Sequence, residues 1–244
     1  MRILAIDTTA KTATAAISEN GRLRALYTLN GTRTHSENML PMIENLLLAA
    51  ELTIDAIDAF ACSAGPGSFT GVRIGVSLIK GLAFGSEKPC ISVSAPEALA
   101  YNLIGSGSSE TVFCPVMDAR REQVYTALFR YSNREMMRLC PDRAISAVEL
   151  LADIKAKGYK DVIFCGDGSY LFREYFKEGL RCTPEKDLWQ NGFSVALAAE
   201  KMLERNETLD DGELSPIYLR SSQAERVKKE SEEQNHGKST GDRV

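Results

Sequence analysis

The two halves of this 244-residue chain repeat one order of predicted secondary structure. Apolar runs of strand length alternate with segments of helical periodicity, and each half contains three strands, a helix, a strand, a helix, a strand and a helix. Two short matches support the repeat: Asp7 and Asp118 each end the first strand of their unit, while "GPGSF" (65–69) and "GDGSY" (166–170) each follow the same later strand. The repeat predicts an α/β chain of two lobes, each of order βββαβαβα.

The same patterns predict the boundaries of the elements and of the lobes. In the first unit we expect strands at 2–7, 12–18, 21–29, 56–63 and 89–94 and helices at 37–50, 70–85 and 95–104. In the second unit we expect strands at 111–118, 123–131, 134–140, 161–166 and 179–184 and helices at 147–157, 171–178 and 193–205. The Gly- and Ser-rich segment 104–110 predicts a linker between an N-terminal lobe at 1–105 and a C-terminal lobe at 106–223. Residues 224–244 are charged and lack aromatic side chains, which predicts a disordered tail.

Composition indicates a globular chain with a substantial core, because 44% of its residues are hydrophobic. The net charge of −4 argues against a protein whose main task is non-specific nucleic-acid binding. The six cysteines form no CxxC pair, so we expect reduced core thiols. The chain opens directly on a strand, shows no signal peptide and has no apolar run long enough to span a bilayer, so we expect a cytoplasmic protein.

The glycine-rich stretch "AGPGSFTGVRIG" (64–75) lies between a predicted strand and a predicted helix. No lysine follows its glycines at Walker spacing, and its GxGxxxG pattern departs from the Rossmann fingerprint. The N–H groups at the helix start could still hold an anion, which makes Gly67 and Ser68 candidate contacts. A glycine within a helix costs about 1 kcal/mol relative to alanine. We therefore expect a neighbouring helix or strand to approach closely at Gly71, Gly75, Gly81 and Gly85.

Five segments, "AIDTT", "HSENMLP", "AGPGSFTGVRIG", "MDARREQVY" and "PIYLR", occur in this order along the chain. Together with the tandem units, they resemble the bacterial TsaB (YeaZ) family over nearly the whole chain up to Arg220. The resemblance implies two tandem ribonuclease H-like, actin-like lobes, the fold of actin, Hsp70 and sugar kinases. It also implies a non-catalytic subunit that binds and activates the related protein TsaD, together with the ATPase TsaE. These proteins make threonylcarbamoyladenosine at position thirty-seven of tRNA. No cofactor is implied, and tRNA is contacted indirectly through the complex.

In the actin-like fold, a glycine-rich turn after the first strand of each lobe binds nucleotide phosphates. The corresponding turns here, "DTTAKTAT" and "DARREQVY", contain no glycine, and their side chains would crowd a triphosphate. The aspartates could instead cap their own turns. The candidate contacts for an anion or nucleotide at these turns are Asp7, Thr8, Asp118 and Arg120.

The sequence predicts no catalytic or metal-binding residues. His35 is the only histidine before the tail, and the position four residues later is Met39, so a histidine pair at helical spacing is absent. No GxSxG nucleophile elbow occurs. The glycine-free turns also argue against the alternative that the chain acts alone as an actin-fold small-molecule kinase or hydrolase.

The helices expected at 37–50 and 70–85 carry more apolar surface than one sheet would cover. The second helix has two apolar stripes, and a surface helix normally needs one. We therefore expect a partner interface here, which the resemblance assigns to a TsaD heterodimer, and a homodimer through the same helices is the alternative. The predicted interface residues are His35, Met39, Leu40, Ile43, Leu47, Val72, Val76 and Ile79.

Overall fold

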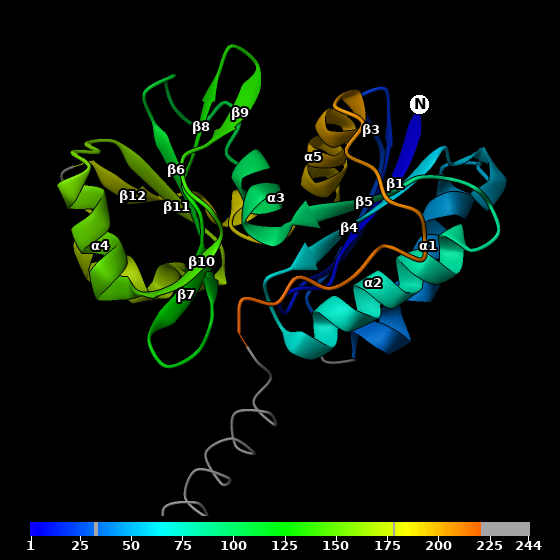
Figure 1. Cartoon of the computed structure of the whole chain (residues 1–244), viewed down its shortest axis with the longest axis horizontal. Helices are drawn as coiled ribbons and strands as arrows, with labels where there is room; N and C mark the ends of the chain where they lie inside the picture. The colour runs from blue at the N-terminus through cyan, green and yellow to red at the C-terminus, as the bar shows by residue number, and fades with distance from the viewer. Residues whose placement is uncertain (32–33, 178, 221–244) are drawn as a thin grey trace, which may run out of the picture.

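The first half of the chain folds around a five-stranded sheet in the computed structural model, which describes residues 1–31, 34–177 and 179–220. The strands are β1 (Arg2–Asp7), β2 (Ala13–Glu19), β3 (Arg22–Leu29), β4 (Ala59–Gly65) and β5 (Cys90–Ser94), in the order β3-β2-β1-β4-β5. β1 pairs antiparallel with β2 and parallel with β4. β1 and β4 are almost wholly buried, because helices cover both faces of the sheet (Figure 1).

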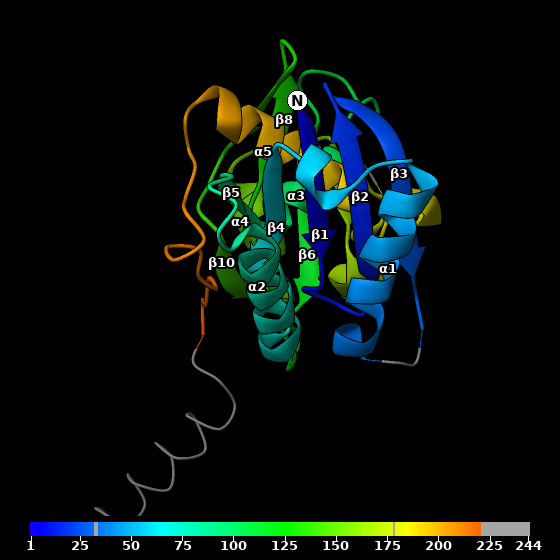
Figure 2. The ribbon, with the colours of Figure 1, turned by 90° about the vertical axis from the view of Figure 1, so that its right-hand side faces the viewer.

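Side chains of β1 alternate between the two faces of this sheet. Leu4 and Ile6 point toward α1 (His35–Ala49) and α2 (Phe69–Ala83), which lie side by side in Figure 2. Ile3 and Ala5 point to the other face, where α5 (Gly192–Glu204) packs. A short 3-10 helix, η1 (Ile54–Ala56), follows α1.

The second half forms a sheet whose central path is β10-β7-β6-β11-β12, which matches the order of the first sheet strand for strand. Its strands are β6 (Val112–Asp118), β7 (Gln123–Thr126), β10 (Arg143–Ser146), β11 (Val162–Cys165) and β12 (Leu180–Cys182). α4 (Ala147–Ala156) covers one face and α3 (Ala95–Tyr101) packs on the other. The matching topologies confirm the predicted fold class of two tandem actin-like lobes.

Two predicted elements of the second lobe differ from the structure. The predicted strand 123–131 is divided into β7 and β8 (Phe129–Ser132), and segment 134–140 forms β9 (Glu135–Arg138), which pairs only with β8. The third strand of the repeat is instead β10, which sequence analysis missed because strand pairing over this distance leaves no local signal. The helix predicted at 171–178 is the end of a 3-10 helix, η2 (Asp167–Tyr175), and a second 3-10 turn, η3 (Glu185–Asp187), follows β12.

The third helix of each unit packs on the sheet of the other lobe. α3 contributes Leu99 and Ala100 to a core with Phe113 and Phe129, whereas α5 packs against β1 and β4. The backbone N–H of Gly192, at the start of α5, donates to Thr14 Oγ1 at 3.0 Å. The lobes are therefore joined by exchanged helices as well as by the linker. The division at residue 105 stays a prediction.

Buried thiols are a feature of both cores. Cys62, Cys90, Cys114 and Cys165 are buried and all six cysteines are free, as expected for reduced core thiols. Burial raises the pKa of Cys90 to about 11 and of Cys114 to about 12, which makes these thiols poor nucleophiles.

Within the described ranges, no helix is long and apolar enough to cross a membrane. The predicted tail at 224–244 lies outside the described residues.

Candidate functional site

A cleft of about 1040 Å³ lies between the lobes, where β1 and β6 end. Its walls come from the turn after β1, the start of α2, the turn between β6 and β7, η2 and the end of the described chain. Four predicted contact residues line it, namely Gly67, Ser68, Asp118 and Arg120. Asp7 and Thr8 are both about 1% exposed and are not part of the wall. The structure thus brings together four of the six candidates for anion contact.

Asp7 is fully engaged by its own lobe. Its carboxylate accepts hydrogen bonds from the Thr9 backbone N–H at 2.8 Å, from Thr9 Oγ1 at 2.7 Å and from Ser63 Oγ at 2.6 Å. Burial raises the pKa of Asp7, and these hydrogen bonds oppose the shift. The side chain therefore caps the turn that follows β1, which is the alternative expected for a strand-end acid.

The glycines at the start of α2 pack against that same turn. A Cβ on Gly67 would lie 2.5 Å from the Thr9 carbonyl oxygen, and one on Gly71 would overlap the Thr8 carbonyl oxygen. Thr8 Oγ1 donates to the Gly71 carbonyl at 2.7 Å, and a Cβ on Gly75 would lie 2.5 Å from that hydroxyl. The close approach predicted at Gly71 and Gly75 is therefore met inside the lobe, by the turn after β1 in place of a helix or strand. A Cβ on Gly81 or Gly85 would have no described atom of another segment within 4 Å, so the prediction is wrong for these two glycines within the described chain.

Ser68 and the β6–β7 turn form facing parts of the cleft wall. Ser68 Oγ caps α2 by accepting the Gly71 N–H at 3.3 Å, and the Ser68 N–H donates to the Thr9 carbonyl at 2.7 Å. Across the cleft, Asp118 accepts the Arg120 N–H at 2.7 Å and lies 3.7 Å from its guanidinium. Asp118 and Arg120, the two candidate contacts on the second lobe, are thus paired with each other.

Asp167 lies beside Asp118 and was missed by sequence analysis, although it is part of the repeated "GDGSY" segment. Its Oδ1 accepts the Asp118 backbone N–H at 3.0 Å. Burial raises the pKa of Asp167, and the nearby charge of Asp118 adds to that shift. Among the described residues, no group of three or more His, Cys, Asp or Glu side chains is placed to hold a metal ion.

His35 ties the start of α1 to the turn after β1. Its Nε2 lies 2.8 Å from the Ala10 carbonyl oxygen, so Nε2 carries the proton and donates. Its Nδ1 is buried and has no hydrogen-bond partner within the described chain. Neither ring nitrogen of His35 hydrogen-bonds to a serine or cysteine side chain in the described chain, whereas a hydrolase triad requires such a bond.

The predicted partner interface requires a correction. Met39, Ile43, Val72, Val76 and Ile79 are at most 2% exposed and belong to the core between α1, α2 and the first sheet. They offer no contact surface, so their assignment to a partner is wrong. Both stripes of α2 are apolar, and the stripe of Val72, Val76 and Ile79, which we assign to the partner from the sequence, packs against the sheet.

The opposite stripe of α2 and its counterpart on α1 form an apolar surface. Leu40 is 46% exposed and Leu48 is 77% exposed, while four further apolar side chains are half-buried. We call this surface the α1–α2 face, and it consists of Leu40, Leu47, Leu48, Ile74, Leu78 and Leu82. Leu40 and Leu47 were predicted interface residues.

A segment to which the sequence analysis assigned no element, apart from the motif "PIYLR", crosses α2. The C-terminal strap, residues 207–220, runs from α5 along α2 to the cleft (Figure 1). Lys80 Nζ donates to the carbonyls of Gly212 and Leu214 at 3.0 and 3.1 Å, and the Ile217 N–H donates to the Ala64 carbonyl at 2.7 Å. Its signal in the sequence is the motif "PIYLR" (216–220).

The strap ends by contacting both lobes. The Tyr218 ring stacks on Phe69 with centroids 4.8 Å apart, and its hydroxyl accepts a hydrogen bond from Arg73 Nε at 2.8 Å. Arg220 Nη1 donates to the Ala119 carbonyl of the second lobe at 2.9 Å. The strap therefore links α2 to the β6–β7 turn across the cleft mouth.

Comparisons with known proteins agree with this architecture. Residues 28–228 match the model of the family TsaD: tRNA N6-adenosine threonylcarbamoyltransferase. The tRNA threonylcarbamoyladenosine biosynthesis protein TsaB of Bacillus subtilis (strain 168) is 32% identical over 92% of this chain and 96% of its own length. The Escherichia coli (strain K12) protein of the same name is 29% identical over 92% and 96%. YeaZ from Pseudomonas aeruginosa superposes with a TM-score of 0.75 at 26% identity, covering 89% of this chain and 99% of that one. The chain therefore belongs to the matching TsaD family and, within it, to the TsaB (YeaZ) proteins.

Proposed function

We propose that this chain is a non-catalytic subunit of the machinery that makes threonylcarbamoyladenosine in tRNA. It binds and activates the threonylcarbamoyltransferase TsaD, and TsaE acts with the pair in the cytoplasm. The observation that carries the proposal is the α1–α2 face, an apolar surface that lies on α1 and α2 of the described chain.

The cleft supports a role without catalysis. The turns after β1 and β6 carry a side chain at every position, Asp7 is turned into its own lobe, and His35 is committed to a backbone carbonyl. A kinase of this fold needs backbone N–H groups that can approach the phosphates closely, and a hydrolase needs an activated nucleophile. The purified chain should therefore release no phosphate from ATP above the background of the same assay without protein.

The α1–α2 face supports a role in assembly. Leu40 and Leu48 are exposed on α1, about two turns and 80° apart around its axis, and the outer stripe of α2 belongs to the helix that packs on the same face of the sheet. Gly81 interrupts that stripe with no atom near it, so a partner helix could approach the backbone of α2 closely. A partner related in fold presents helices of the same kind, which suits helix-on-helix packing.

The test is the binding of purified TsaD to the wild-type chain and to two matched variants. Leu48→Arg places a charge on the α1–α2 face, and Val148→Arg places the same charge at a 73% exposed position of α4. A contact at the centre of an interface contributes about 2 kcal/mol or more, so Leu48→Arg should weaken the Kd by roughly thirtyfold. Val148→Arg should bind as the wild type does. Equal binding by both variants would refute the proposal.

Self-association through the same face is the competing assembly. Light scattering of the chain alone and with TsaD separates the two cases by mass. We expect TsaD to convert the chain into a heterodimer, whatever the mass of the chain alone. A homodimer that stays unchanged in the presence of TsaD would show a self-associating scaffold instead.

A further inference from the structure

Arg73 lies on the outside of α2, against a stacked pair of aromatic rings. Its guanidinium carbon is 3.9 Å from the centre of the Phe69 ring and 5.8 Å from the centre of the Tyr218 ring. The Tyr218 hydroxyl accepts the Nε–H at 2.8 Å, and the two rings stack on each other at 4.8 Å. Tyr218, which lies 145 positions from Arg73 along the chain, thus helps to fix the guanidinium of Arg73.

This fixed guanidinium has no acidic partner. Arg73 and Tyr218 are both exposed, and no acid among the described residues forms an ion pair with Arg73. Only Nε is used, so the two Nη groups remain free to donate. A planar fork with two adjacent donors matches a carboxylate or a phosphate in a bidentate arrangement. Because stacking already restricts the side chain, little further rotamer freedom is lost on binding.

The position of Arg73 decides between ligands in the cleft and ligands on the outer surface. Phe69 and Tyr218 line the cleft, but Arg73 is not part of its wall. On α2 its side chain points about 100° around the helix axis from Ile74, the neighbouring member of the α1–α2 face, so it borders that face on one side. Arginine and tyrosine are enriched in protein interfaces relative to the rest of the surface, and the rim around the apolar centre of an interface is polar.

We propose that Arg73 is an anchor for a carboxylate of the partner subunit, an Asp or Glu side chain that meets the fork when the partner covers the α1–α2 face. Tyr218 and Phe69 are positioning residues that hold the fork at the edge of this face. The inference rests on the proposed function, because it requires TsaD as the protein that docks there. It makes the C-terminal strap part of the interface as well as of the fold.

Substitutions of Arg73 distinguish bidentate binding of a carboxylate by the guanidinium from simple attraction between opposite charges. Arg73→Lys keeps the charge but loses the fork and the stacking plane, so we expect it to weaken the Kd for TsaD about tenfold, nearly as much as Arg73→Gln. Tyr218→Phe keeps the ring and removes the bond to Nε, so its effect should be a few-fold. Higher salt should weaken the wild-type complex more than the Arg73→Gln complex, since only the wild type holds the charge pair.

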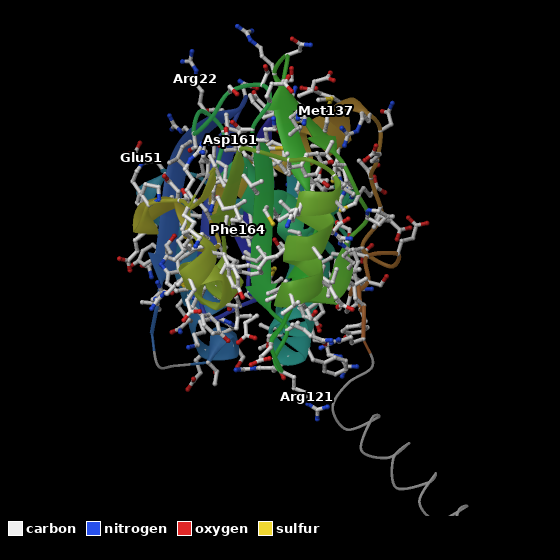
Figure 3. The ribbon with its side chains drawn as sticks, turned by 90° about the vertical axis from the view of Figure 1, so that its left-hand side faces the viewer. Arg22, Glu51, Arg121, Met137, Asp161 and Phe164 are labelled. Carbon is white, nitrogen blue, oxygen red and sulfur yellow. The ribbon has the colours of Figure 1, made fainter. Side chains whose placement is uncertain are left out.

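Arg22 provides the matched control, because it is another exposed arginine without an ion pair in the described chain and lies on the opposite edge of the molecule from the cleft turn at Arg121 (Figure 3). Arg22→Gln should leave the Kd unchanged, and melting curves should show all variants folded.

The measurement is the Kd of the full chain for TsaD by titration calorimetry, with tRNA binding by the same complexes measured in parallel. Wild-type affinity for both Arg73→Gln and Arg73→Lys would overturn the inference while leaving the proposed function intact. Failure of the wild type itself to bind TsaD would instead refute the proposed function. Loss of tRNA binding with unchanged TsaD affinity would show that the fork meets an RNA phosphate, which also overturns the carboxylate assignment.

Discussion

Replacing Val76 by arginine tests which stripe of α2 faces the core. Val76 is 2% exposed and packs in the cluster that includes Leu4, Ile6 and Ile79. The substitution places an unpaired guanidinium in an apolar site, which costs about 3–5 kcal/mol, and overpacking adds about 1–3 kcal/mol. A chain of this size has a free energy of unfolding of about 5–15 kcal/mol, so much of the stability would be lost.

The assay is thermal unfolding followed by circular dichroism. At about 2–4 °C per kcal/mol, Val76→Arg should lower the Tm by at least about 10 °C or prevent folding altogether. Val76→Ala keeps the site apolar and should cost about 2 kcal/mol, which provides a variant that still folds. Leu48→Arg, on a side chain that is 77% exposed, should change the free energy of unfolding by less than about 0.5 kcal/mol. A wild-type Tm for Val76→Arg would show that the core assignment is wrong.

Four further substitutions have expected outcomes. Gly71→Ala should destabilise the fold by about 3 kcal/mol in urea titrations because the new Cβ overlaps a backbone carbonyl oxygen, whereas Gly81→Ala should stabilise it by about 1 kcal/mol because its site is open. Arg121→Gly should raise the Tm by about 2–4 °C, since Arg121 has a φ of 53° between two other left-handed residues; an unchanged Tm would contradict this strain. Arg143 holds the pKa of Asp153 below its unfolded value of 3.8, so the pair stabilises the protein above that pH and the contribution disappears as the pH falls through the folded pKa. Asp153→Asn should therefore lower the free energy of unfolding by up to about 1 kcal/mol at pH 7 and less at pH 3, and a pH-independent difference would contradict the assignment.

Local sequence patterns determined most of the secondary structure and the fold class. Apolar runs of strand length gave β1, β4, β6 and β11, because strands covered on both faces need apolar residues at nearly every position. Asp7 as a turn cap, the packing role of Gly71 and Gly75 and the glycine-free turns could also be read from residue types at fixed positions.

Tertiary structure decided the features that depend on which surfaces meet. Nothing local distinguishes the stripe of Val72 and Val76 from that of Ile74 and Leu78, because both are apolar, and only the sheet selects one for the core. The same holds for β10, whose partner strand is about twenty residues distant, and for α5, which packs on the sheet of the first lobe. The Arg73 stack likewise needs Tyr218, which reaches α2 only because the strap returns along it. Contacts between distant segments are set by the free energy of the whole packed chain, so they cannot be predicted from the periodicity of one segment.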